Sequence, residues 1–430
     1  GDEETSQRHP LLVRRWMGAS IAGLLILGLA GSGLVGYKLR SQRKEKALAR
    51  LSYVSAGRFA GGSGNENFGT GLSISVRGEY FVASSPYRNS NSGIVRLFKQ
   101  TATSGSTRYT QVDSKEGPGG AGSYFGTSVS IDNKGQYVAV GAQRENAAKG
   151  CVHVYKITGD KLVKIGDRIC GANSSDQFGR SVSLVGFDDP DNSYTYTVTL
   201  AVGAPSAMNN NSGYAKVYKL NGSSFKQIGD KITKGLMDKQ FGLAVSLGSD
   251  GLTIIVGAPM MNQAYVYRFQ SNVWAQVGNE LTYAGAPSNA YCGTSVAIDD
   301  SSMNALLGCL NYQKVGYWNR LVGNKYFEID TVNANLNGFG TSLAMSADGT
   351  KMVVGNPLYG AKENGSVKMY VYDEGFQQIS QNDGKSDWGK AGYATAMSPD
   401  GAYVLVGSPS ATNSLRSDGY VEVLVCDACL

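Results

Sequence analysis

The chain has 430 residues, among them 57 glycines, 25 tyrosines, 10 prolines and only two histidines. The low content of charged residues and proline argues against a disordered chain, and the scarcity of histidine argues against imidazole catalysis and histidine metal sites. Residues 1–50 hold nine Lys and Arg against four Asp and Glu, so most of the net charge of +6 belongs to this segment, and the rest lacks the basic excess of a nucleic-acid-binding protein.

The first predicted element is a transmembrane helix over residues 16–37. This run of 22 residues has no charged side chain and, as a helix, would be about 33 Å long, which matches the hydrocarbon core of a bilayer. A polar tail, residues 1–15, precedes it and a basic juxtamembrane linker, residues 38–50, follows. A cleaved signal peptide is the alternative, although its apolar region is usually shorter. Small residues recur four apart in the run, which would suit a helix partner in the membrane.

Residues 51–430 form a seven-fold repeat with gaps of 47 to 63 residues between successive units. Each unit begins with Phe-Gly or a near equivalent, and a Gly-Ala-Pro or related signal starts 15 residues after that glycine in six of the seven units. Alternating strands and glycine-bearing turns fill each unit, so the pattern predicts an all-β, seven-bladed β-propeller of four-stranded antiparallel blades. The first signals are Phe68-Gly69, Phe125-Gly126, Phe178-Gly179, Phe241-Gly242, Cys292-Gly293, Phe339-Gly340 and Ala391-Gly392.

The seventh unit supplies three strands, whereas an additional strand, residues 51–60, precedes the first Phe-Gly. A fourth strand lies in the same place before the first signal of every other unit. We therefore expect residues 51–60 to complete the last blade, which would leave no open sheet edge where the ring closes.

With Phe-Gly followed at fixed spacing by Gly-Ala-Pro, residues 51–430 resemble the FG-GAP repeats of integrin α subunits. The resemblance implies an extracellular interaction head rather than an enzyme. Integrin-type blades often carry Ca²⁺ loops, but the corresponding turns here offer at most two carboxylates, so no cofactor is expected. The extended turn of the third unit is the exception, because Asp188, Asp189 and Asp191 make it a candidate Ca²⁺ site.

The loops that follow the Gly-Ala-Pro signals should gather on one face of the ring and bind a protein or glycan ligand. Aromatic, arginine and methionine side chains are enriched at such interfaces, although exposed loop tips also carry them without binding anything. The candidates are Tyr87, Arg88, Arg144, Met260, Met261, Tyr312, Tyr359 and Arg416.

Six cysteines fall into three pairs along the chain. The first two pairs each flank a hairpin and would form disulfides in an oxidising compartment, although Cys292 and Cys309 could instead pack as small apolar side chains in place of the Phe and Ala of their signals. The third has the spacing of a redox or zinc half-site but lacks a second ligand pair. The pairs are Cys151 and Cys170, Cys292 and Cys309, and Cys426 and Cys429.

The side of the membrane on which the propeller lies is open to two interpretations. Six Lys and Arg follow the helix against three before it, which favours the cytoplasm or an organelle matrix. The cysteine pairs and four Asn-x-Ser glycosylation sequons favour the extracellular or lumenal side, which we expect. The sequon asparagines are Asn173, Asn210, Asn221 and Asn364.

These observations together predict a non-enzymatic, single-pass membrane glycoprotein whose propeller acts in adhesion, as a receptor or as a scaffold. An accessory structural subunit of an organelle membrane complex is the alternative. A glycan-processing hydrolase is a further one, since the Ser-x-Asp-Gly turns at residues 346–349 and 398–401 resemble sialidase Asp-boxes.

Overall fold

The structure is a computed structural model that describes residues 51–62, 65–103, 106–189, 192–206, 212–235, 240–322, 325–334, 338–411 and 418–429. The chain divides into two compact units, Gly1–Ala49 and Arg50–Leu430, of which the second is described below. The expected transmembrane helix at residues 16–37, with its tail and linker, lies outside the described residues. Within the described ranges, no helix combines the length and apolar character needed to span a membrane.

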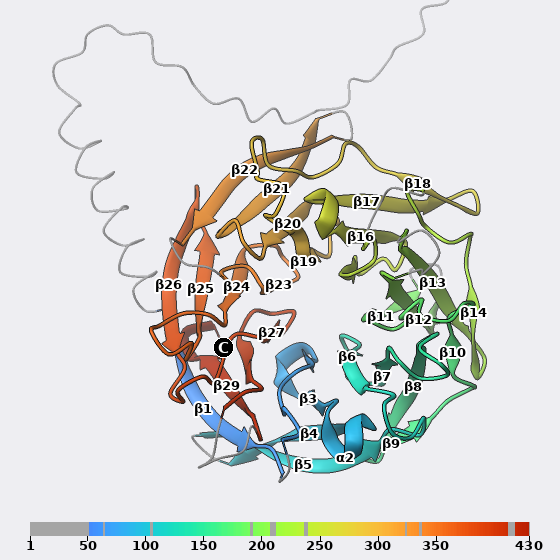
Figure 1. Ribbon diagram of the computed structural model, residues 1–430, viewed down its shortest axis with the longest axis horizontal. Helices are drawn as coiled ribbons and strands as arrows, with labels where there is room; N and C mark the ends of the chain where they lie inside the picture. Colours follow the sequence, from blue (N-terminus) through green and yellow to red (C-terminus); the bar gives the residue numbers. More distant parts are fainter. Residues whose placement is uncertain are drawn as a thin grey trace, which may run out of the picture. The chain divides into compact units, whose positions relative to one another are not determined.

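Seven antiparallel sheets are arranged radially around a central axis (Figure 1). The predicted seven-bladed propeller of four-stranded blades is therefore confirmed, with the one variation that the outer strand of blade 2 is split into β9 and β10. The first three blades are blade 1, with β2 (Leu72–Ile74), β3 (Tyr80–Ser85), β4 (Ile94–Thr103) and β5 (Ser106–Glu116); blade 2, with β6 (Phe125–Ile131), β7 (Tyr137–Ala142), β8 (Cys151–Thr158), β9 (Lys161–Lys164) and β10 (Ile169–Cys170); and blade 3, with β11 (Ser181–Asp189), β12 (Asn192–Ala204), β13 (Tyr214–Asn221) and β14 (Ser224–Gln227).

The other four blades complete the ring. They are blade 4, with β15 (Val245–Leu247), β16 (Thr253–Ala258), β17 (Gln263–Gln270) and β18 (Val273–Gln276); blade 5, with β19 (Cys292–Ile298), β20 (Asn304–Cys309), β21 (Lys314–Val322) and β22 (Lys325–Asn333); blade 6, with β23 (Ser342–Met345), β24 (Lys351–Asn356), β25 (Ser366–Tyr372) and β26 (Phe376–Asp383); and blade 7, with β27 (Ala394–Met397), β28 (Tyr403–Ser408), β29 (Tyr420–Cys426) and β1 (Tyr53–Ala60).

The strand expected at residues 51–60 is β1, and it closes the ring. It pairs antiparallel with β29, from Tyr53 opposite Cys426 to Ala60 opposite Tyr420. Blade 7 is thus built from both ends of the propeller sequence, and its outer strand lies beside β29 at the rim (Figure 1). Because β1 covers the outer edge of β29, this pairing leaves no open sheet edge on that strand and ties the start of the propeller sequence to its end.

The two repeating signals interlock neighbouring blades. Every phenylalanine of the Phe-Gly pairs is fully buried, and the glycine that follows it adopts a positive φ, +85° at Gly179, which a side chain would strain. The glycine of the second signal then packs against the next blade, because a Cβ on Gly141 would lie 2.0 Å from the carbonyl oxygen of Gly179. The Ser128 hydroxyl donates to that same oxygen at 2.8 Å. The signals therefore encode close backbone contact between blades.

Hydrophobic side chains fill the spaces between adjacent blades. Between blades 7 and 1, for example, Phe68, Phe81 and Leu405 are fully buried in one cluster, and the rings of Phe81 and Phe98 stack with centroids 4.4 Å apart. Full burial of such a side chain contributes about 1.5–3 kcal/mol relative to its exposure. Seven such layers make the ring a rigid support for the residues around its axis.

An axial pocket as the candidate functional site

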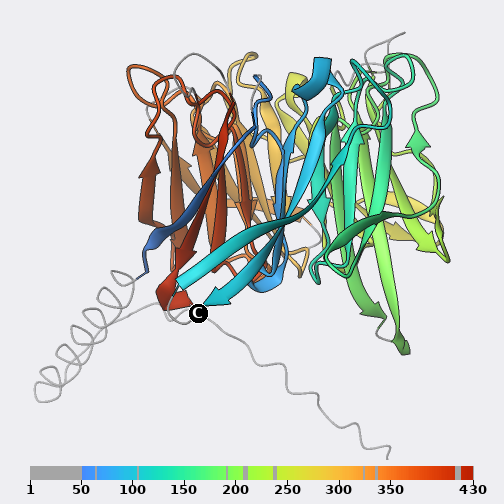
Figure 2. The ribbon, with the colours of Figure 1, turned by 90° about the horizontal axis from the view of Figure 1, so that it is seen from below.

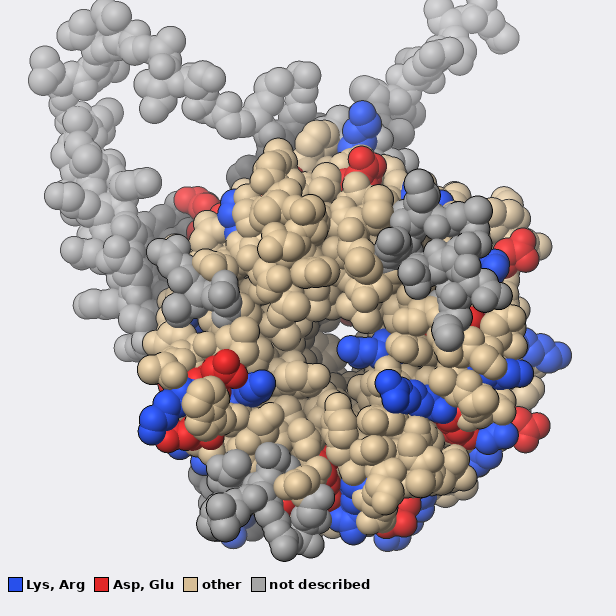
Figure 3. Space-filling model, in the orientation of Figure 1, with Lys and Arg blue, Asp and Glu red and all other residues tan. Residues whose placement is uncertain are grey.

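A cavity of about 410 Å³ lies on the propeller axis, because all seven blades contribute to its wall. Its volume is within the usual range for small-molecule sites. We call it the axial pocket, and Figure 3 shows the ring hollowed at its centre, with basic side chains at the rim of the hollow. Each blade provides the residue directly after its Phe-Gly or equivalent pair. These seven ring residues are Thr70, Thr127, Arg180, Leu243, Thr294, Thr341 and Tyr393.

A tight turn points each ring residue inward. In blade 2, Tyr124 has a φ of +55°, and its carbonyl oxygen accepts hydrogen bonds from the N–H of Thr127 at 3.0 Å and from its hydroxyl at 2.7 Å. The hydroxyls of Thr70, Thr294 and Thr341 donate in the same way to the residue three positions before them. Their protons are thus committed to the backbone, so toward a ligand these four oxygens act as hydrogen-bond acceptors.

Arg180 stands in the ring where four other blades have threonine, and it brings a positive charge to the pocket wall. Among the described residues that line the pocket, it carries the only charge. Its side chain is partly buried, and its guanidinium forms no ion pair with another described residue. A guanidinium presents five N–H donors in a planar fork, so Arg180 can bind a carboxylate, a phosphate or a polarised carbonyl oxygen.

Loop residues add an aromatic and amide rim above the ring. Gln143 lines the pocket, and its side-chain oxygen is buried without a hydrogen-bond partner among the described groups. Tyr87 and Tyr124 also line the pocket and meet edge to face, 5.5 Å apart, while the Arg144 guanidinium lies 5.2 Å from the Tyr124 ring centroid. Burial, with smaller contributions from Tyr393 and Tyr124, raises the pKa of Tyr87 above its ordinary value, so its phenol remains a proton donor at neutral pH.

The eight predicted binding residues do not form one site. Tyr87 lines the axial pocket and Arg144 lies beside it, but Arg88 is held by an ion pair of 2.9 Å with buried Glu66. Met260 and Met261 are exposed on the short helix η2 (Pro259–Met261).

The other predicted residues of this set lie apart from the pocket wall or outside the described ranges. Tyr312 packs against Tyr283 with ring centroids 6.0 Å apart, and Tyr359 is half-buried in the turn after β24. Arg416 lies outside the described residues. Sequence reasoning missed Arg180, Gln143 and Tyr393, although each departs from the residue that most units carry at its position.

In the candidate metal site of blade 3, the one carboxylate whose side chain is described pairs with a lysine. Asp188 is exposed and forms an ion pair of 2.7 Å with Lys134, while the Asp189 side chain and Asp191 lie outside the described residues. In the described part of the chain, no three His, Cys, Asp or Glu side chains form a group that could hold a metal ion.

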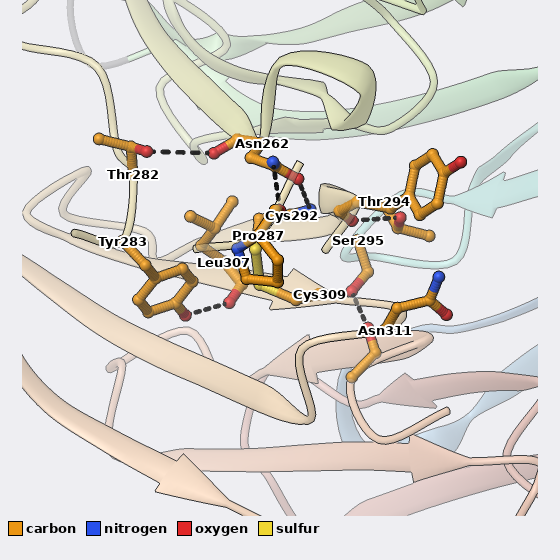
Figure 4. The surroundings of a disulfide bond; sticks show 12 residues. Asn262, Thr282, Tyr283, Pro287, Cys292, Thr294, Ser295, Leu307, Cys309 and Asn311 are labelled. Atoms are coloured by element: carbon orange, nitrogen blue, oxygen red, sulfur yellow. Dashed lines mark hydrogen bonds between the residues drawn. A yellow bond between two sulfur atoms is a disulfide. The ribbon is translucent and has the colours of Figure 1, made fainter. Parts of the chain in front are cut away.

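Three disulfides link the six cysteines: Cys151–Cys170, Cys292–Cys309 and Cys426–Cys429. The first two join paired strands, and Figure 4 shows the surroundings of the second, where the Asn262 side chain accepts the N–H of Cys292 and donates to the carbonyl oxygen of Pro287. The third joins the end of β29 to the short helix η3 (Asp427–Cys429), so its cysteines are disulfide-bonded rather than free for the redox or zinc half-site that their spacing suggested.

The sequon asparagines differ in their exposure. Among the sequon asparagines, Asn173 and Asn221 are exposed, Asn364 is half-buried, and Asn210 lies outside the described residues.

The Asp-box-like turns are stabilised internally. The Ser346 hydroxyl donates to Asp348 and the Ser398 hydroxyl to Asp400. These carboxylates therefore hold hairpin turns and do not line the axial pocket.

Comparison with known proteins yields matches of fold only. No protein-family model matches the chain, and no curated protein matches its sequence. Three solved structures are similar: a Lactobacillus plantarum protein with a TM-score of 0.51 at 13% identity, covering 73% of this chain and 87% of that one; a putative 6-phosphogluconolactonase from Bacteroides uniformis, with 0.51 at 9% identity, covering 73% and 88%; and a periplasmic gluconolactonase from Pseudomonas aeruginosa, with 0.50 at 12% identity, covering 71% and 82%.

These findings correct three sequence-based predictions. The FG-GAP, integrin-like assignment was wrong, because no family model supports it and two of the similar propellers bear lactonase names. The same comparison contradicts two further predictions. One is the adhesion, receptor or scaffold role, and the other is that the chain is not an enzyme. The physical reason lies in the signals, since Phe-Gly and Gly-Ala-Pro are accounted for by close packing between blades and need no shared ancestry with integrins.

Proposed function

We propose that the chain is a hydrolase of the lactonase type that binds its substrate in the axial pocket. The observation that carries the proposal is Arg180, a guanidinium without an ion-pair partner among the described residues, set in a wall of hydroxyl, amide and phenol groups. The lactonase names of two similar propellers support the reaction class, while the pocket itself supports the site.

The proposed reaction adds water to the carbonyl carbon of a lactone. Negative charge then develops on the carbonyl oxygen, where the Arg180 guanidinium donates hydrogen bonds to it. The bond between the acyl carbon and the ring oxygen breaks, the ring oxygen takes up the proton that the water loses, and a hydroxy acid results. Its carboxylate remains attracted to Arg180 until it leaves the pocket.

Two neighbouring groups would orient the reactants. The unpartnered oxygen of Gln143 can accept a hydrogen bond from the attacking water or from a substrate hydroxyl, and the Tyr87 phenol can donate one. The described wall of the pocket contains no carboxylate or imidazole. Rate enhancement in this proposal therefore comes from charge stabilisation and orientation rather than from a strong general base.

The decisive variant is R180T. Threonine occupies the equivalent position in four other blades, so the local backbone accepts it. Loss of one oxyanion donor typically lowers kcat by about 10²–10³-fold. We expect a loss of that size for R180T on δ-gluconolactone above the spontaneous rate, and little change for the matched control R108T, at an exposed arginine outside the pocket. Wild-type turnover of both δ-gluconolactone and alkyl-substituted δ-lactones at the spontaneous rate, or an R180T variant as active as wild type, would contradict the proposal.

We also propose that residues 16–37 anchor the propeller to a membrane, on its extracellular or lumenal side, with a second membrane helix as a partner. The uncharged run, the exposed sequons Asn173 and Asn221 and the cysteine pairs support this arrangement. In sealed vesicles, we expect the propeller to resist added protease and to lose mass on treatment with a glycosidase. Digestion from the cytoplasmic face without a change in mass would favour the opposite side.

A further inference from the structure

The wall of the axial pocket is divided into a polar and an apolar part. Two kinds of position line it in more than one blade: the ring position after Phe-Gly, and the third position of the Gly-Ala-Pro signal. Blade 2 contributes the polar Gln143 at the third position and blade 3 the charged Arg180 at the ring position, whereas blade 4 contributes Leu243 at the ring position and blade 5 contributes Leu310 at the third position, above Thr294 in its ring position. Blades 4 and 5 are adjacent in the ring, so the two leucines lie on the same side of the pocket, and we call this pair the apolar arc.

Packing of the propeller does not account for either leucine. Both are partly exposed, and neither belongs to the hydrophobic clusters that the described residues form between blades. The ring position holds threonine in four blades, and the third position of the second signal holds proline in five. The fold therefore accepts other residues at these places, and the apolar side chains face the pocket.

From this division we infer that the substrate is a lactone with an alkyl or aryl substituent, whose carbonyl lies at Arg180 and whose apolar part lies against Leu243 and Leu310. This inference rests on the proposed function and adds the substrate class to it. A bare sugar lactone would leave the two leucines in contact with water. An apolar substituent would remove their surface from water, and each buried methylene would raise the affinity about three- to fourfold.

The space available agrees with such a ligand. A second cavity of about 260 Å³ shares all seven ring residues with the axial pocket and is otherwise lined by the residues that follow them along the inner strands. The substituent of a lactone bound at Arg180 can therefore extend past Leu243 along the axis of the ring. The substituent thus has an apolar contact and room to extend.

The test uses the full chain and a homologous series: δ-valerolactone, δ-hexalactone, δ-octalactone and δ-decalactone. We expect kcat/KM of the wild type to rise about threefold per methylene until the apolar arc is filled. L243T, which installs the common ring residue, and L310Q, which installs the residue of blade 2, should flatten this dependence. L252T is the matched control, because Leu252 is exposed outside the pocket, and it should keep the full dependence.

The outcomes separate the two proposals. If the wild type hydrolyses every lactone of the series at one rate in an Arg180-dependent manner, the apolar arc does not select the substrate and the inference falls while the proposed function stands. If L243T and L310Q keep the chain-length dependence of the wild type, the inference is also overturned. If no lactone is hydrolysed, or hydrolysis does not depend on Arg180, both proposals fail.

Discussion

Replacing Gly407 by alanine tests whether the ring is closed by direct contact between the last and first blades. A Cβ on Gly407 would lie 2.1 Å from the carbonyl oxygen of Gly69 and 3.2 Å from Leu72 Cδ1. An ordinary carbon–oxygen contact is more than 1 Å longer, so the two blades must separate locally. The Gly407 carbonyl also accepts a hydrogen bond of 3.0 Å from Gly392, which such a shift would strain.

The expected cost combines two effects. Overpacking of a tight contact costs about 1–3 kcal/mol, and a weakened buried hydrogen bond adds about 1 kcal/mol. We therefore expect G407A to lower the free energy of unfolding by about 2–4 kcal/mol, measured by urea denaturation with the slope m compared between variants. G57A is the control on the same seam, because its Cβ would meet only Phe59 at 3.7 Å. A G407A protein as stable as the wild type would refute the reasoning.

Two further predictions concern a disulfide and a buried carboxylate. Removing the disulfide with C292S/C309S should cost about 3 kcal/mol, since the two cysteines are 17 residues apart, and equilibrium unfolding should show this loss without a shift in the control S288A, at an exposed serine of the same blade entry. Burial alone would raise the pKa of Glu66, but hydrogen bonds from Arg96, Gly62 and Arg88 hold it below its ordinary value of 4.5. The stability that Glu66 contributes should thus be present above pH 4.5 and be lost as the pH falls through the lowered pKa. E66Q should remove this part of the acid sensitivity, measured as the free energy of unfolding against pH. An E66Q protein with the same pH dependence as the wild type would contradict this prediction.

Much of the fold could be predicted because the repeats report backbone packing. The regular recurrence of Phe-Gly and Gly-Ala-Pro marks positions where a Cβ would collide with the next blade, as at Gly141, so their number equals the number of blades. The extra strand at residues 51–60 was recognisable because three strands follow the last Phe-Gly equivalent. The family assignment failed for the same reason, since a packing signal of this kind carries no information about ligands.

The candidate site was harder to predict because binding was expected at loop tips. Only the position of Tyr87 led to the pocket, whereas Arg88 proved to be the partner of Glu66. The informative signal was the contrast between units, in which Arg180 and Leu243 replace the threonine of four other blades. That contrast becomes meaningful once the turn after Phe-Gly is known to point its next residue toward the axis, and this geometry is not readable from residue types alone.

The most direct test of the central claim is a crystal structure of the full chain with 5-hydroxydecanoate, the product expected from δ-decalactone. We expect the ligand in the axial pocket, with its carboxylate within hydrogen-bond distance of the Arg180 guanidinium and its alkyl chain against Leu243 and Leu310. A ligand bound elsewhere on the propeller, or an axial pocket that stays empty at saturating concentration, would contradict it.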